Sequence, residues 1–111
     1  EGVSVAARIV SQLADFNASC DKVHLGPAGV VVGATVGSAV ADLGIDLAAL
    51  HGPVLAPGVG AQGAGPAQVR DVFRGARSAV LASSSRAILE SGPDLRGLRS
   101  AYKRAVTELA G

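Results

Sequence analysis

The sequence predicts an α/β fold made of three strand–helix units, and three observations support that prediction. Short apolar segments begin near residues 29, 54 and 79, so one unit recurs about every 25 residues. The first segment, residues 29–35, centres on three consecutive valines, which is typical of a parallel strand covered on both faces. Stretches with helical spacing of apolar residues separate the segments. This repeat fits a doubly wound sheet or part of a (β/α)8 barrel, and a whole barrel needs about 250 residues.

The first element is a helix from Ser4 to about Asn17, for which Ser4 is a suitable N-cap. A polar loop follows and leads through Gly26-Pro27 into the first strand. The apolar positions of the helix recur at helical spacing and predict one buried face, made of Val5, Ile9, Leu13 and Phe16.

The second helical stretch extends from about residue 36 to residue 50, and Thr35 or Ser38 is expected to cap it. Gly44 lies inside this stretch, so the helix is weakened or split there. The tripeptide at residues 51–53, His-Gly-Pro, ends it. The second strand is then expected at Val54–Ala56, with a glycine-rich loop behind it.

The third helix is expected to begin at Pro66, a residue that suits the first helical position, and to end at Gly75. A third strand over residues 79–82 precedes a short helix that begins at residues 83–86. Gly92-Pro93 ends this helix, and Asp94 caps a final amphipathic helix. The apolar residues expected inside are Val69, Val72 and Phe73 of the third helix, and Leu95, Leu98, Tyr102, Val106 and Leu109 of the last.

The composition limits the class of protein. A chain of 111 residues makes one domain, and its 49% of hydrophobic residues excludes a disordered chain. The apolar runs are too short for a membrane-spanning helix and no signal peptide opens the sequence, so we expect a cytoplasmic protein without a membrane partner. Cys20 is the single cysteine, which excludes an internal disulfide and a cysteine-based zinc site.

Two features suggest that the sequence is the C-terminal part of a longer protein. It begins with Glu1 and contains no methionine, so an initiator end is absent. Its first residues enter a helical pattern directly, without a preceding strand. We therefore expect residues 1–111 to be the C-terminal segment of one domain whose upstream part lies outside this chain.

The loops that follow the strands are the predicted binding region, because ligands lie at the carboxyl ends of the strands in both architectures. They cover residues 33–35, 57–63 and 83–86. Free N–H groups at the start of the short helix would point at an anion, and Arg86 would add a charged contact. Gln62 could donate its amide, and glycines at 58, 60 and 63 let the backbone approach a ligand. Together these features predict a site for a phosphate monoester.

Residues 58–63 also match G-x-G-x-x-G, the dinucleotide-binding fingerprint, which is a weak signal alone. In that fold the helix begins inside the glycine motif, whereas Ala64-Gly65-Pro66 intervenes here. The acidic residue expected after the next strand is replaced by serines and Arg86. A dinucleotide-binding domain, with Arg86 on a 2′-phosphate, therefore stays as an alternative of lower weight.

Other polar residues carry weaker signals. His24 and His51 are not spaced as metal ligands with any carboxylate, so no metal site is expected. The three serines at 83–85 lack the G-x-S-x-G pattern of a nucleophile. Residues 70–104 hold eight of the ten Lys and Arg residues, but no aromatic residues interleave with them for base stacking, so no nucleic-acid partner is expected. The basic residues of the last helix lie off its apolar stripe and are interpreted as a solvated face: Arg96, Arg99, Lys103 and Arg104.

Three motifs in this order resemble the last three strand ends of orotidine 5′-phosphate decarboxylase. They are V-V-G-A-T at residues 31–35, P-G-V-G-A-Q-G at residues 57–63 and S-S-R at residues 84–86. The likeness is greatest to the bacterial branch with a P-G-V-G-x-Q-G loop, and it covers nearly the whole chain. Two positions depart from the common family pattern, since Ala64 and Ser85 each stand where a glycine is usual.

The resemblance implies that the chain supplies strands six to eight of a (β/α)8 barrel and their helices. It implies decarboxylation of orotidine 5′-monophosphate to uridine 5′-monophosphate (UMP) by a homodimer, without metal or organic cofactor. By the same resemblance the phosphate is held by Gln62, Gly63, Ser85 and Arg86. The pocket for the rest of the substrate is lined by Thr35, Pro57, Gly58 and Val59.

The family's catalytic Lys and Asp network has no counterpart in these residues. Lys22 and Lys103 lie without carboxylates at the family's spacing, so no catalytic residue is expected in this chain. We therefore expect the chain to hold the phosphate half of an active site and to be inactive alone. Three alternatives remain: another phosphate-binding barrel such as a sugar-phosphate isomerase or synthase, the dinucleotide-binding domain, and a βα fragment that acts only as a binding or assembly module.

Overall fold

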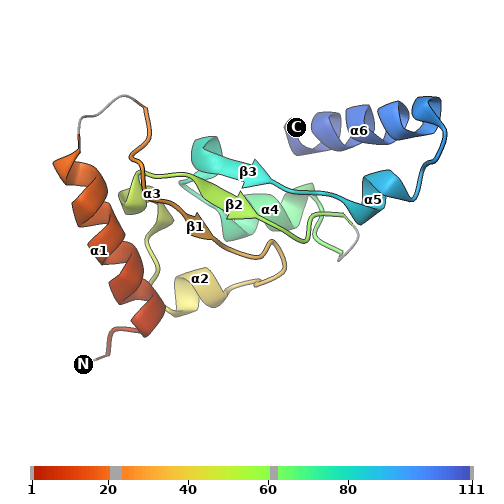
Figure 1. Ribbon diagram of the computed structural model, residues 1–111. Coiled ribbons are helices and arrows are strands. Elements are labelled where there is room, and N and C mark those ends of the chain that lie inside the picture. The colour runs from red at the N-terminus through yellow and green to blue at the C-terminus, as the bar shows by residue number, and fades with distance from the viewer. Residues whose placement is uncertain (1, 21–23, 61–62, 111) are drawn as a thin grey trace.

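A computed structural model describes residues 2–20, 24–60 and 63–110. The described elements alternate between helices and strands along the chain (Figure 1). The strands are β1 (Val30–Val31), β2 (Val54–Ala56) and β3 (Val80–Ala82). The helices are α1 (Val5–Ser19), α2 (Ala39–Asp42), α3 (Leu47–Leu50), α4 (Pro66–Val72), the 3-10 turn η1 (Arg77–Ala79), α5 (Arg86–Leu89) and α6 (Leu95–Ala110).

The three strands form one parallel sheet in the order β1-β2-β3. Val54 of β2 pairs with Val30 of β1 on one side and with Val80 of β3 on the other, so the first residues of the three strands are register partners. Among the described strands the order never reverses. Such a sequential order occurs in a (β/α)8 barrel and also within one half of a doubly wound sheet. The α/β prediction with parallel strands is confirmed.

The hydrophobic core lies on one face of the sheet. Val54 and Ala56 of β2 are fully buried there, against Leu50 of α3 and Phe73 just beyond α4. The alternate residue of β2, Leu55, points to the opposite face and is 42% exposed. Because successive residues of a strand point to opposite faces, the helices cover one side of the sheet and leave the other bare.

Several helix boundaries confirm the sequence prediction because the signals that set them are local. The Ser4 side chain accepts a hydrogen bond from the N–H of Ala7 at 3.1 Å and caps α1. The Asp94 carboxylate does the same for α6, accepting from the N–H of Gly97 at 3.0 Å. Gly44 has a φ of +66° and separates α2 from α3, so the second helical stretch is split as expected.

The predicted caps and ends of two other helices need correction. Thr35 caps nothing in the structure, and Ser38 stands at the N-cap position of α2 without capping it, since its hydroxyl donates to Asp42 instead. The third helix, α4, ends at Val72 and not at Gly75, because Phe73 leaves the helical conformation to enter the core.

The buried faces predicted for the two long helices are wrong for most of their residues. On α1, Val5, Ile9 and Phe16 are exposed, while Val10 and the polar Asn17 are buried. On α6, Ala101 is the buried residue among those described. The apolar stripe of each helix exists as predicted, but little of the described chain packs against it. The exposed members on α6 are Leu95, Tyr102 and Val106.

Asn17 joins three segments at the end of the sheet where the strands begin. Its side-chain amide donates to the carbonyls of Ala28 at 2.9 Å and Leu50 at 2.8 Å, and its carbonyl accepts from the N–H of Ala28 at 2.9 Å. The surrounding backbone passes so close that a Cβ on Gly26 or Gly52 would overlap with Asn17. Only glycine fits at these two positions, so the local sequence is matched to this buried amide.

Candidate functional site

The loops after the three strands lie side by side at one edge of the sheet. The N–H of Ala34, after β1, donates to the carbonyl of Pro57, after β2, at 2.8 Å. The N–H of Ser83, after β3, donates to the carbonyl of Ala56 at 2.9 Å. The structure therefore brings together the three loops in which the sequence placed its binding residues.

The loop after β2 depends on its glycines. Gly58, Gly60 and Gly63 have φ values of +90°, +83° and +89°, a backbone region that other L-residues rarely adopt. The N–H of Gly60 donates to the carbonyl of Ala64 at 2.9 Å, and the N–H of Gly63 donates to the carbonyl of Gly60 at the same distance. These bonds close the loop into a tight turn. Gln62, its predicted phosphate-binding side chain, lies outside the described residues.

The loop after β3 touches the glycine loop. A Cβ placed on Gly60 would lie 3.0 Å from the Cβ of Ala87 and 3.5 Å from the hydroxyl oxygen of Ser84. A side chain at residue 60 would therefore crowd Ala87, so the glycine favours the contact between the loops as well as its own turn. This contact between the two loops lies where the sequence predicted a shared anion site.

Arg86 is the first residue of α5, and its side chain is exposed to solvent. Ser85 is at the N-cap position without a side-chain cap. Within the described ranges, the N–H groups of Ser85, Arg86 and Ala87 have no hydrogen-bond acceptor, and neither does the Arg86 guanidinium. Several N–H donors and one cation are therefore available at this loop, and together they favour an anion.

Two departures from the family pattern fit the backbone without strain. Ser85 has a φ of −116°, a value that any residue can adopt. Among described non-glycine residues, only His51 has a positive φ, so Ala64 is also unstrained. Neither position needs the glycine that is usual there.

The residues predicted to line the pocket are divided between solvent and core. Thr35 and Pro57 are exposed at the loop edge, and Gly58 is half-buried. Val59 is only 7% exposed and pairs with Ala64 in an isolated parallel bridge. Roles for these residues toward a ligand remain predictions, and the burial of Val59 gives it a clear structural role as well.

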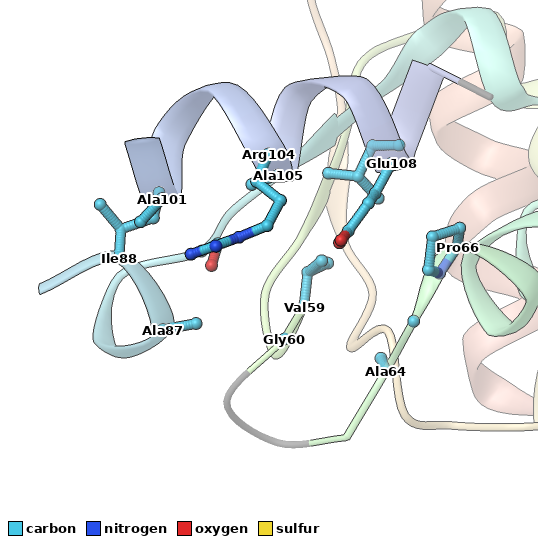
Figure 2. Close-up of a pocket in the computed structure, with 13 residues that line it drawn as sticks. Val59, Gly60, Ala64, Pro66, Ala87, Ile88, Ala101, Arg104, Ala105 and Glu108 are labelled. Carbon is cyan, nitrogen blue, oxygen red and sulfur yellow. The ribbon is translucent and has the colours of Figure 1, made fainter. Parts of the chain in front are cut away.

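A cavity of about 140 Å³ lies behind the two loops, where α6 covers them (Figure 2). Val59, Gly60 and Ala64 line it from the glycine loop, and Ala87 lines it from α5. The other described residues at its walls include Ser84, Ala101 and two charged residues of α6, Arg104 and Glu108.

The basic residues expected on a solvated face of the last helix are exposed, and one of them, Arg104, also lines this cavity. Figure 2 shows the Arg104 side chain extending over α5, and the Glu108 carboxylate lying close to Val59. Both follow the buried Ala101 at spacings of three and seven residues, so they share its side of the helix. Their spacing from the small residue Ala101 is the only sequence signal that places these two residues at the cavity. The apolar stripe of α6 lies on a different face of the helix.

Among the described residues, no cluster of three His, Cys, Asp or Glu side chains is arranged to hold a metal ion. No described helix combines the length and the apolar character that crossing a bilayer demands.

The chain is therefore an α/β segment with a parallel sheet, whose strand-end loops present backbone N–H groups and an arginine. A protein from Salinispora arenicola named orotidine 5′-phosphate decarboxylase is 45% identical over 107 residues, which are 96% of this chain and 36% of the relative. A protein of the same name from Streptomyces coelicolor is 44% identical over 110 residues, 98% of this chain and 37% of the relative. The chain is thus homologous to a part of orotidine 5′-phosphate decarboxylase, and the resemblance inferred from its motifs is confirmed.

A solved structure agrees with these relatives. The crystal structure of a protein from Streptomyces avermitilis, provisionally described as orotidine 5′-phosphate decarboxylase, superposes with a TM-score of 0.80 at 43% identity. The match covers 96% of this chain and 35% of that one. No family model matches the chain. The chain spans about a third of the length of the relatives it matches.

The contact between the two loops gives a first testable prediction. Gly60→Ala should lower the free energy of unfolding by more than the roughly 1–2 kcal/mol that a left-handed backbone costs an alanine, because the new methyl group also presses on Ala87. Gly37→Ala is the matched control, since Gly37 has a φ of +61° and open space around its Cβ position. Urea denaturation measures both. Equal losses would show that the loops do not hold each other in place.

Proposed function

We propose that this chain is the phosphate-binding part of an orotidine 5′-phosphate decarboxylase and supplies strands six to eight of its (β/α)8 barrel. The observation that carries the proposal is the junction of the glycine loop and the start of α5. There the N–H groups of Ser85 and Arg86 and the Arg86 guanidinium have no acceptor among the described residues, next to the loop that contains Gln62. The similarity to enzymes of that name supports the same assignment.

In the proposed reaction, orotidine 5′-monophosphate loses its carboxylate as CO₂, and the electron pair stays on the ring carbon. A lysine outside these residues then protonates that carbon and gives UMP. Gln62, Gly63, Ser85 and Arg86 hold the phosphate monoester at the strand ends. Thr35, Pro57, Gly58 and Val59 form the adjoining wall of the pocket. Binding energy from the phosphate aids a reaction at the distant ring carbon when it is used to hold the transition state.

The rest of the proposal concerns the whole protein. Residues 1–111 are proposed as one segment of a single barrel domain, and the whole protein as a cytoplasmic homodimer that acts without metal or organic cofactor. Its substrate is a small molecule, and no nucleic acid takes part. The sequential parallel sheet with one bare face supports a barrel segment, because a barrel places a second set of side chains on that inner face.

A chimera tests this function. The 107 residues of this chain that match would replace the corresponding part of the Salinispora arenicola protein. We expect the chimera to convert orotidine 5′-monophosphate to UMP and to bind UMP more tightly than uridine. A chimera that unfolds cooperatively but binds neither the substrate nor UMP, while the parent binds both, would refute the proposal.

The same chimera separates the alternatives. Another phosphate-binding barrel predicts that sugar phosphates compete with UMP and that no decarboxylation occurs. A dinucleotide-binding domain predicts tight binding of NADP and poor competition by mononucleotides. An assembly module predicts that phosphates are ignored altogether.

A further inference from the structure

Arg104 and Glu108 bring two opposite charges to the cavity behind the two loops. Side chains four residues apart on a helix can reach each other, but the ion pair found among the described residues joins Arg74 to Asp71 and includes neither of them. Figure 2 shows that they diverge instead, with the Arg104 guanidinium over α5 and the Glu108 carboxylate beside the glycine loop. The positive charge of α6 is therefore at the start of α5, and the negative charge is at the other wall.

The cavity reaches both sides of the N–H donors at the start of α5. Ser84 and Ala87 line it. In the sequence these two residues flank Ser85 and Arg86, whose N–H groups have no acceptor in the described part of the chain. Consecutive Cα atoms are about 3.8 Å apart, so each donor is one residue away from the cavity wall. An anion on these donors would be separated from the Arg104 guanidinium by one turn of backbone and the cavity itself.

The size and the lining of the cavity allow charges to act across it. Its volume is about 140 Å³, so its width is comparable to the roughly 8 Å over which salt screens charges at physiological ionic strength. Most of its other walls are apolar, among them Val59, Ile88 and Ala101. A field that crosses an apolar region is weakened less than a field through bulk water.

We propose that Arg104 and Glu108 set the affinity of the neighbouring anion site through their charges. Arg104 raises the affinity for a phosphate monoester, and Glu108 lowers it. This inference rests on the proposed function. Neither side chain touches the ligand, and both act through the field across the cavity. The net effect of the pair favours the phosphate, because Arg104 lies over α5 and Glu108 lies on the side of the glycine loop.

A purely structural role for the two side chains makes a different prediction. Both residues are exposed overall, so each can be replaced by glutamine, a neutral side chain of similar length, without a buried group being lost. If the side chains only support the loops, both replacements should weaken ligand binding or leave it unchanged. If their charges act on the phosphate, the two replacements should change its affinity in opposite directions.

A chimera built on the Streptomyces coelicolor relative tests the proposal, because its match covers 98% of this chain and so includes both residues. We expect Arg104→Gln to weaken UMP binding about three- to tenfold and Glu108→Gln to strengthen it about threefold. Arg104→Lys should keep most of the affinity, since the positive charge stays. Uridine, which carries no phosphate, should bind all variants equally. Isothermal titration with UMP and with uridine measures these changes.

Arg99→Gln is the matched control on the same helix. It removes the same charge from another exposed arginine, but five residues of helix turn its side chain about 140° away from that of Arg104. We expect UMP affinity to stay within about 1.5-fold. The titrations are repeated in 1 M salt, where screening acts over about 3 Å. There the effects of both cavity substitutions should largely disappear, whereas a displaced loop would weaken binding at any salt concentration.

The outcomes separate this inference from the proposed function. Changes of the same sign for Arg104→Gln and Glu108→Gln, losses that persist in 1 M salt, or equal effects of Arg104→Gln and Arg99→Gln would overturn it. If such a chimera still converts orotidine 5′-monophosphate, the function stands. Opposite, salt-sensitive changes in a chimera that binds UMP without decarboxylation would support the inference and refute the function. A chimera that binds no UMP would overturn both.

Discussion

Asn17→Leu is expected to lower the free energy of unfolding by about 3 kcal/mol or more. The leucine has nearly the shape of asparagine but leaves three backbone groups without their partner: the N–H and carbonyl of Ala28 and the carbonyl of Leu50. An unsatisfied buried polar group costs about 1–3 kcal/mol. Asn17 is only 2% exposed, so water cannot readily replace the lost amide. Urea denaturation of the chain measures the loss.

The control for this substitution lies on the same helix. Gln12→Leu exchanges an amide for leucine on the exposed side of α1, and it should change stability by less than about 0.5 kcal/mol. Asn17→Asp should lose at least as much as Asn17→Leu, because a buried carboxylate would face the carbonyl oxygens of Ala28 and Leu50 that the amide now contacts. A loss for Asn17→Leu no larger than that of the Gln12 variant would mean that the segments around Ala28 and Leu50 are held by other contacts.

The positions of the elements were predictable because local signals set them. Val54–Ala56 is bounded by a proline on each side, and Ser4 and Asp94 cap helices within their own first turns. The role of Asn17 was not predictable in this way, since its partners lie 11 and 33 residues further along the chain. An asparagine at the end of a helix gives no sign of which backbone groups will reach it.

The candidate site was predictable in part for the same reason. The glycine loop and the start of α5 follow strands, and parallel strands bring their ends to one edge, so their proximity follows from the order of the elements alone. The cavity lined by Arg104 and Glu108 was not predictable, because it depends on how α6 packs against the loops in the tertiary structure. The exposed stripes of α1 and α6 show the limit of periodicity, since it identifies an apolar face but not the surface that covers it.

Arg86→Ala in the chimera is expected to weaken UMP binding by about 10- to 150-fold, which corresponds to the roughly 1.5–3 kcal/mol of a hydrogen bond to a charged group. The affinity for uridine should stay unchanged, because uridine lacks the phosphate that Arg86 is proposed to hold. The value of kcat/KM for orotidine 5′-monophosphate should fall with the UMP affinity. Isothermal titration with UMP and uridine, beside steady-state kinetics, measures these effects.

Arg77→Ala is the matched control for charge. Arg77 is also exposed and flanks the same strand, but it precedes β3 in η1, whereas Arg86 follows β3 at the loop edge. Removing either arginine changes the net charge equally, so a general electrostatic attraction for a phosphate would weaken similarly in both variants. A contact at the site predicts a large loss for Arg86 and less than about a twofold change for Arg77. A loss below about fivefold for Arg86, or equal losses for both, would assign the phosphate to other residues and leave the glycine loop with a structural role only.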